Sequence, residues 1–365
     1  MLSWKYLRRF DWFLLIAMLA LTAFGIWVIR GVEMNSIYEE RVKRQTLYAV
    51  AGLGAFLVGA LVDYRVWGRL WRLVYLGLIG LLGLVLVLGG SFGGARSSFD
   101  LGAFRVQPAE LAKVALVLVL AKYMSDHDMR HIKHVLVSLG LTLLLMAMIV
   151  IEPDLGGALL LAPIWLVMAF MAGMRLWHMG GLSLLGMAVV PLGLRFLEGY
   201  QLERIINFLD PQSDASGGGY NTLQALIAIG SGGWWGQGYG RGLQSQLHYL
   251  RQRYTDYIFS VIAEELGLIG VSLFFLAVLF LLFRLLRVGR LASDPFGQLL
   301  AVGMATVLFI QTALNVGVNL NLLPTTGQTL PFISYGGSSL MTFMFGLGIA
   351  ESVMLRRQLL KFDWT

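Results

Sequence analysis

The sequence has no cysteine and few charged residues. Without cysteine, the 365-residue chain can form neither a disulfide nor a thiolate metal site. Charged residues make up 13% of the chain, against roughly 25% in ordinary soluble domains. Hydrophobic residues make up 57%. This balance excludes an ordinary soluble domain and indicates a chain that lies largely in lipid.

Long apolar runs recur along the whole chain, each of about 17 to 25 residues, the length that crosses a hydrocarbon core of about 30 Å. A single buried core helix could imitate one such run, but not ten of them. We therefore predict an all-α integral membrane protein in which residues 1–365 form a single polytopic membrane domain. The predicted transmembrane helices are 13–29, 46–62, 71–89, 109–124, 135–151, 154–173, 179–196, 257–286, 296–320 and 336–355.

The first apolar run, 13–29, is predicted to stay in the protein as a span. Lys5, Arg8 and Arg9 precede it, as in a signal peptide, but no small-residue cleavage site follows and Arg30 closes it.

Lysine and arginine predict the orientation, because short loops that carry them remain cytoplasmic. With the N-terminus inside, the predicted inner segments hold the majority of the 28 lysines and arginines, and an even number of spans places the C-terminus inside too. The large hydrophilic loop, about 197–255, is then extracytoplasmic, and residues 125–134 are cytoplasmic. The net charge of +7 therefore reflects orientation in the membrane, and we expect no nucleic acid partner.

Polar residues of the predicted spans gather near their outer ends. Ionisable residues in a membrane are costly and mark functional candidates, although bonds between helices are the alternative explanation. For the polar face of the ninth span, where the residues are four apart, we favour that alternative. Together these residues predict a polar cavity open to the outside: Glu110, Lys113, Glu152, Asp154, Glu264, Glu265, Gln311, Asn315 and Asn319.

The large loop contains a short apolar stretch, Asn221–Ile229, with asparagine as a plausible N-cap and Gly230 as the stop. It is too short to span, so we predict an interfacial or re-entrant helix. The glycine-rich segment 230–242 follows, and its glycines fit tight turns as well as amides that cradle a phosphate.

The eighth predicted span, 257–286, would be about 45 Å long as an ideal helix, so it must tilt or project outward. Projection would place Asp256 and the Glu264–Glu265 pair near the outer interface. A carboxylate at a helix start is favoured by the helix dipole, so position alone leaves Asp256 as either a helix-start carboxylate or a catalytic group.

Six blocks of sequence from Gln107 onward resemble a known family in content and order. They are QPAELAK (107–113), EPDLG (152–156), RIINFLDP (204–211), GGYNTLQALIAIGSGGWWGQGYG (218–240), TDYIFSVIAEELGLIG (255–270) and LPTTGQTLPFISYGGSSL (323–340). The family is SEDS (shape, elongation, division and sporulation), whose members are peptidoglycan glycosyltransferases of the bacterial cytoplasmic membrane. IGSGG at 229–233 and SQLHYL at 245–250 look closer to its elongation branch, RodA, than to its division branch, FtsW.

The chain departs from the family pattern before Asp256. The family commonly has Pro-Glu-x-His before Thr-Asp-Phe, whereas this chain has Arg-Gln-Arg-Tyr at 251–254 before Thr255, Asp256 and Tyr257. The carboxylate usually proposed as catalytic is kept, but the glutamate and the histidine beside it are absent. Any mechanism that needs a second acid or an imidazole at these positions is therefore in doubt.

The resemblance implies polymerisation of lipid II, the undecaprenyl-pyrophosphoryl disaccharide-pentapeptide. An α-linked pyrophosphate donor that yields a β1,4 bond is most simply displaced in one inverting step. Asp256 would take the proton of the acceptor hydroxyl as general base, and cations would neutralise the departing pyrophosphate. No cofactor is demanded by the residues, and no metal ligands are assigned, although Mg²⁺ would be a reasonable bridge for a pyrophosphate.

Further substrate-binding residues carry two interpretations each. Arg204 would hold a diphosphate oxygen or anchor the loop at the interface. Lys113 would form a cavity-shaping ion pair with Glu110 or touch the pyrophosphate. Asp154 follows a proline at a helix start, so it would cap the helix or bind substrate.

Two serines, Ser334 and Ser338, would line the cavity or merely allow the tenth span to pack closely. The expected partners are a class B penicillin-binding protein transpeptidase, other membrane proteins of the elongation machinery, and membrane lipids. The rival functions are a lipid II flippase, a division-specific member of the family, and a scaffold. Transporters often carry internal repeats, and none is obvious here.

Overall fold

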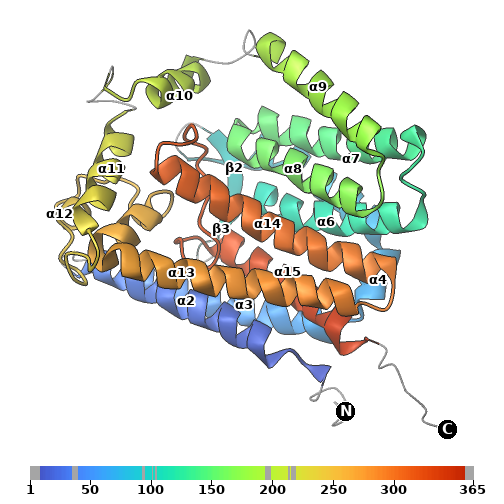
Figure 1. Ribbon diagram of the computed structural model, residues 1–365, viewed down its shortest axis with the longest axis horizontal. Helices are drawn as coiled ribbons and strands as arrows, with labels where there is room; N and C mark the ends of the chain where they lie inside the picture. Colours follow the sequence, from blue (N-terminus) through green and yellow to red (C-terminus); the bar gives the residue numbers. More distant parts are fainter. Residues whose placement is uncertain are drawn as a thin grey trace.

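The computed structural model describes residues 9–34, 40–92, 95–100, 102, 105–193, 199–212, 214 and 219–357, and these form a helical bundle (Figure 1). Each predicted span falls on one helix, and residues 194–196 of the seventh lie outside the described residues. The helices are α2 (Trp12–Glu33), α3 (Glu40–Leu61), α5 (Trp71–Leu88), α6 (Pro108–Asp126), α7 (Ile132–Ile151), α8 (Leu155–Met171), α9 (Leu176–Gly193), α13 (Ile258–Leu291), α14 (Pro295–Asn319) and α15 (Gly337–Leu355).

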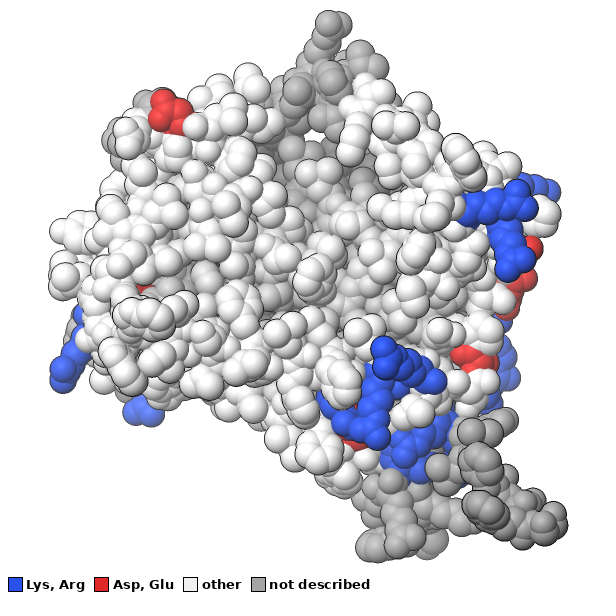
Figure 2. Space-filling view, viewed as in Figure 1, with Lys and Arg blue, Asp and Glu red and all other residues white. Residues whose placement is uncertain are grey.

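Seven of these helices are long and apolar enough to cross a membrane, and α8 is a shorter apolar helix. The seven are α2, α3, α5, α7, α13, α14 and α15. The face drawn in Figure 2 agrees with a protein in lipid, because a broad uncharged surface lies between charged side chains at its margins.

Four shorter helices complete the helical part: α4 (Tyr64–Arg69), α10 (Gly199–Leu209), α11 (Tyr220–Gly232) and α12 (Leu243–Gln246). The short helix predicted at 221–229 coincides with α11, which is longer at both ends. Helix α11 packs on the first turns of α13.

A small antiparallel sheet between α5 and α6 was not predicted. Its strands are β1 (Gly90–Phe92), β2 (Ala95–Asp100) and β3 (Arg105–Val106), in the order β1-β2-β3. The segment is a polar connection between two helices, and strand pairing satisfies its backbone N–H and C=O groups. Apart from this sheet, the regular secondary structure of the described residues is helical.

Helices α14 and α15 form the centre of the bundle, with 78% and 83% of their most apolar stretches buried. Helix α15 approaches α3 closely through small residues. A Cβ on Gly348 would lie 2.2 Å from the carbonyl oxygen of Phe56, and one on Gly59 would lie 2.7 Å from that of Phe345. Glycine on both helices therefore permits the backbone contact.

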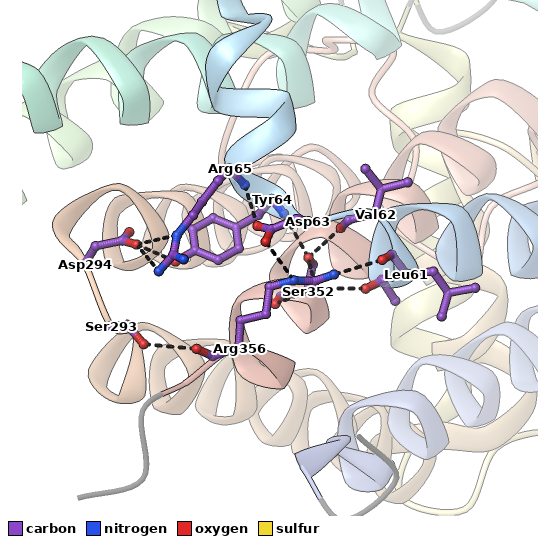
Figure 3. Close-up of polar contacts among 10 residues, drawn as sticks. Leu61, Val62, Asp63, Tyr64, Arg65, Ser293, Asp294, Ser352 and Arg356 are labelled. Carbon is purple, nitrogen blue, oxygen red and sulfur yellow. Dashed lines mark hydrogen bonds and ion pairs between the residues drawn. The ribbon is translucent and has the colours of Figure 1, made fainter. Parts of the chain in front are cut away.

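Ion pairs join the helices at the end of the bundle where α2 begins and α15 ends. Arg284 of α13 binds Asp11 at 2.6 Å, and the Asp11 N–H donates to Glu351 of α15 at 2.8 Å. Beside them, Arg65 binds Asp294. Arg356, at the end of α15, binds Asp63 (Figure 3). We call this the terminal end of the bundle; Asp256 lies at the other end, before α13.

Candidate active site

Helix α13 is broken near the end that carries Asp256. At Gly267 the φ of 64° and ψ of −165° are not helical. In a continuous helix each carbonyl accepts from the N–H four residues on. The break therefore frees the carbonyls of Glu264 and Glu265 and the N–H groups of Leu268 and Ile269.

The glycine-rich segment, 230–242, binds all four of these groups. The N–H groups of Gln237 and Gly238 donate to the two freed carbonyls at 2.9 and 3.1 Å. The carbonyls of Gly233 and Trp234 accept from the two freed N–H groups at 2.9 and 3.2 Å. The N–H groups of Gln237 and Gly238 are thus used within the protein, so they do not cradle a phosphate.

The backbones of the glycine-rich segment and α13 approach so closely that three positions have no room for a side chain. A Cβ on Gly236 would lie 2.1 Å from the carbonyl oxygen of Glu265, and one on Gly232 would lie 1.9 Å from that of Ala263. A Cβ on Gly267 would lie 2.4 Å from the nitrogen of Gly236. The segment and the break in α13 are therefore fitted to one another, and together they fix the first turns of α13 against the loop.

Asp256 lies two residues before α13, where two cavities meet. It is partly buried. One cavity is about 350 Å³ and the other about 670 Å³, and both are lined by Asp256, Gln252 and Gly327. We call the first the Arg204 cavity and the second the Arg44 cavity, after a cation in each.

The sequence did not single out the cations of the Arg44 cavity. Arg44 lies near the start of α3 and Arg105 in β3, and Tyr48, Tyr254 and Tyr335 form part of the wall. In the sequence Arg44 and Arg105 look like ordinary basic residues at helix ends. Only the fold shows that they share a cavity with Asp256.

The surroundings of the Asp256 carboxyl raise its pKa. Burial is the main cause that raises its pKa to about 6; Asp154 acts in the same direction, and Arg204 opposes it. A carboxylate with a pKa just below neutrality is largely ionised at pH 7 and still basic enough to accept a proton, which suits a general base.

Lys113 and Glu110 form the ion pair that the sequence suggested. Their charged atoms are 2.7 Å apart and both side chains are buried. The Lys113 ammonium also donates to Gln311 at 2.9 Å. Glu110 lines the Arg44 cavity but Lys113 does not, so the geometry favours the cavity-shaping interpretation.

Of the two other charged residues predicted to bind substrate, Arg204 lines the Arg204 cavity and Asp154 lines neither cavity. Asp154 caps α8 by accepting from the N–H of Gly157 at 2.8 Å. Arg204 of α10 lines the cavity and donates to the carbonyl of Thr325 at 3.3 Å. Both charges act on Asp256, so the capping role of Asp154 and an electrostatic role coexist.

The two predicted serines differ in their surroundings. Ser338 lines the Arg44 cavity, and its hydroxyl accepts from the N–H of Gln107 at 2.9 Å. Ser334 is buried and lines neither cavity. Its hydroxyl donates to the carbonyl of Thr255 at 2.6 Å, so it acts on the chain next to Asp256.

Three glutamates of the predicted polar cluster line neither cavity. Glu264 accepts from the N–H groups of Gln244 and Ser245 at 2.7 and 3.2 Å and so braces the loop. Glu265 lies beside it in α13. Glu152, after α7, is fully buried, and burial raises its pKa to about 8.

An apolar groove leads away from the Arg44 cavity. Ser338 lines both that cavity and a smaller apolar cavity of about 220 Å³. The smaller cavity shares Leu111, Thr342 and Phe345 with another of about 450 Å³, which reaches Trp67 between α5, α6 and α15. Each of the three cavities thus shares lining residues with the next, and we call the two apolar ones the apolar groove.

Metal ligands are not grouped in the described part of the chain: no three His, Asp or Glu side chains there could hold an ion together. The polar lining of the two cavities combines arginines, amides and hydroxyls with the carboxylates of Glu203, Asp100 and Glu110. Among the lining carboxylates, Asp256 is the one shared by both cation-containing cavities.

Comparison with known proteins gives consistent relatives over nearly the whole chain. The family model described as "Cell cycle protein", for FtsW, RodA and SpoVE, matches residues 8–358. The probable peptidoglycan glycosyltransferase FtsW of Geobacter metallireducens is 38% identical over 371 residues, covering 97% of each chain. The peptidoglycan glycosyltransferase MrdB of Escherichia coli is 35% identical over 350 residues, covering 95% of this chain and 93% of MrdB.

Solved structures share the fold. A chain from a study titled "Structural coordination of polymerization and crosslinking by a peptidoglycan synthase complex" superposes with a TM-score of 0.82 at 32% identity, covering 94% of this chain and 97% of that one. The rod shape determining protein RodA of Thermus thermophilus superposes with a TM-score of 0.73 at 29% identity, covering 96% of this chain and 98% of that one.

Proposed function

Since this chain belongs to the FtsW/RodA/SpoVE (SEDS) family and is a multi-pass peptidoglycan glycosyltransferase, we propose that it polymerises lipid II into β1,4-linked glycan strands. The reaction is an inverting displacement: the acceptor 4-hydroxyl oxygen bonds to the anomeric carbon, and the bond from that carbon to the undecaprenyl pyrophosphate breaks. Asp256 takes the hydroxyl proton, and the pyrophosphate leaves with the bonding electrons.

The observation that carries this proposal is the place of Asp256 between two cavities. A polymerase must hold two lipid-linked sugars at once, with the base within reach of the hydroxyl that attacks. A single carboxylate lining both cavities meets that need without the glutamate and histidine that the sequence lacks.

The cations supply the second requirement. Each cavity contains arginine, Arg204 in one and Arg44 with Arg105 in the other. Guanidinium groups bind phosphate oxygens through two parallel hydrogen bonds, and cations placed where charge develops on a leaving group lower the barrier. Each lipid pyrophosphate can therefore meet at least one arginine. Lys113, already bound to Glu110, contributes through that pair.

The apolar groove provides a path for a lipid tail. It adjoins the Arg44 cavity at Ser338, which lines both, and its lining is almost wholly apolar. A polyprenyl chain lying in the groove would keep its pyrophosphate beside Arg105 and its carbons out of water. This supports a substrate that is anchored in a membrane.

We place the reaction at the outer face of the bacterial cytoplasmic membrane. In this orientation ten spans leave both termini in the cytoplasm, with the 197–255 loop outside. We further propose a role in cell elongation, on the RodA-like blocks at 229–233 and 245–250; the FtsW-named relatives make division the alternative. The partner is a class B penicillin-binding protein, which would crosslink the strands that this chain makes.

A flippase is the competing function, because transporters also contain broken helices. In α13, however, the groups freed at the break are bound by the glycine-rich segment, which leaves none to hold a coupling ion.

Purified protein in detergent, given labelled lipid II, tests the proposal. We expect glycan ladders from the wild type and from an Asp214→Asn control, an exposed loop carboxylate. We expect none from Asp256→Asn. Lipid movement across liposomes without any polymer would instead indicate a flippase.

A further inference from the structure

The backbone just before α13 is held by other parts of the bundle. The carbonyl of Tyr254 accepts from the N–H of Tyr335 at 2.8 Å, and the carbonyl of Thr255 accepts from the hydroxyl of Ser334 at 2.6 Å. The carbonyl of Asp256 accepts from two side-chain amides of α14. Three successive carbonyls are thus fixed, while the Asp256 carboxylate stays in the cavities.

The amides that hold Asp256 belong to Asn315 and Asn319. Their Nδ2 atoms donate to the Asp256 carbonyl oxygen at 2.9 and 2.8 Å. Both side chains are buried, with 1% and 0% of their surface exposed. Water therefore does not reach them to replace either bond.

Asn319 makes a second contact that explains its position. Its Oδ1 accepts from the N–H of Ser260 at 3.0 Å and from the Ser260 hydroxyl at 2.6 Å. In an α-helix the carbonyl of residue 256 would accept from the N–H of residue 260 directly. The carboxamide of Asn319 bridges these two groups, and the Ser260 N–H is shared between Asn319 and the carbonyl of Tyr257, which accepts at 3.1 Å.

This bridge holds the chain at the start of α13. Tyr257, at the N-cap, provides no side-chain cap, so Asn319 takes over capping from a neighbouring helix. Without Asn319 the Asp256 carbonyl would keep only the bond from Asn315, and the Ser260 N–H only its bond to the Tyr257 carbonyl at 3.1 Å. The backbone at Asp256 would then be held less firmly, and its carboxylate would move from the junction of the two cavities.

We propose that Asn319, supported by Asn315, is a positioning residue that holds the backbone of Asp256 so that its carboxylate faces both cavities. Neither asparagine lines a cavity, so neither is expected to touch substrate. The proposal rests on the proposed role of Asp256 as general base. It assigns to the polar face of α14 a function beyond the bonding between helices expected from its sequence.

The test compares Asn319→Leu, which is similar in size and cannot hydrogen-bond, with the wild type. Asn319→Ala is made alongside, because it only removes atoms and cannot overpack. Thr312→Val is the matched control: Thr312 is buried on the same helix, and its hydroxyl has no hydrogen-bond partner among the described residues. Polymerisation of lipid II is measured over a range of substrate concentrations, together with thermal unfolding.

Since misplacing a catalytic group by about 1 Å can cost about 10²-fold in rate, we expect kcat to fall by about 10- to 100-fold in both Asn319 variants. We expect KM to stay within about threefold and Thr312→Val to match the wild type. In an Asp256→Asn background, Asn319→Leu should lower the residual rate no further, because its effect passes through Asp256.

Several results would overturn the proposal. Wild-type kcat in a folded Asn319→Leu or Asn319→Ala protein refutes it, and so does a raised KM with unchanged kcat. If Asp256→Asn is inactive while the Asn319 variants are normal, only the positioning role fails. If Asp256→Asn itself polymerises normally, the general base assignment fails first, and the positioning role fails with it.

Discussion

Replacing Asp256 with asparagine should remove activity and, at neutral pH, stabilise the protein. The two effects have one cause. Burial disfavours the charged carboxylate and raises its pKa from 3.8 to about 6. The charged form is what a general base needs, and it is also what the folded protein holds at a cost.

The magnitude follows from proton linkage. The folded state binds the proton more tightly than the unfolded state, so stability falls as pH rises from about 4 to about 6 and the full cost remains above that range. A shift of about two pKa units corresponds to about 3 kcal/mol. Asp256 is only partly buried, so this figure is an upper limit. Asparagine avoids the cost at every pH.

Thermal unfolding in detergent at pH 8 and at pH 4 checks the expected gain in stability. Glycan synthesis, measured in parallel, checks the expected loss of activity. We expect Asp256→Asn to unfold a few degrees above the wild type at pH 8, with the difference vanishing near pH 4. Asp214→Asn should differ at neither pH. Normal glycan synthesis by Asp256→Asn would refute the base assignment, and a variant less stable than wild type at pH 8 would refute the electrostatic reasoning.

The rate of the wild type, as kcat/KM, should fall about tenfold per pH unit below about pH 6, because protonated Asp256 cannot accept a proton; a rate that stays level down to pH 5 would contradict this. Lys113→Met should destabilise the protein by about 3 to 5 kcal/mol, because Glu110 is left buried and unpaired. Adding Glu110→Gln should restore most of that loss, as seen by thermal unfolding. Gly236→Ala should lower the unfolding temperature by several degrees, since its Cβ would meet a carbonyl at 2.1 Å, whereas Gly230→Ala, with open space around it, should not; equal effects would argue against the fitted contact.

Sequence patterns predicted the features that depend on residues close to one another in the sequence. Apolar runs of spanning length located the helices, since a helix in lipid needs no information beyond its own composition. The Lys113–Glu110 pair was also foreseeable, because residues three apart meet on one helical face. The same holds for the shared face of Asn315 and Asn319.

The remaining features depend on contacts between distant segments. A polar face on α14 does not reveal that Asn319 bridges the Asp256 carbonyl and the Ser260 N–H. Glycine at 236 does not reveal that its partner is a break at Gly267. Arg44 and Arg105 join Asp256 only because α3 and β3 lie beside the loop before α13. Each of these contacts depends on how the helices and strands are arranged in space, and the sequence patterns do not give that arrangement.

The break at Gly267 has a consequence for how the protein enters the membrane. The segment from Leu268 to Leu291 is about 36 Å long at 1.5 Å per residue, enough to cross the hydrocarbon core unaided. The four backbone groups at the break would be prohibitively costly in bare lipid, so they mark the boundary of the inserted helix. We expect insertion to finish at Gly267 and the preceding turns of α13 to fold afterwards, on the glycine-rich segment that was synthesised first. Biogenesis of the membrane helices and completion of the catalytic end are then separate events, and the second can fail without the first.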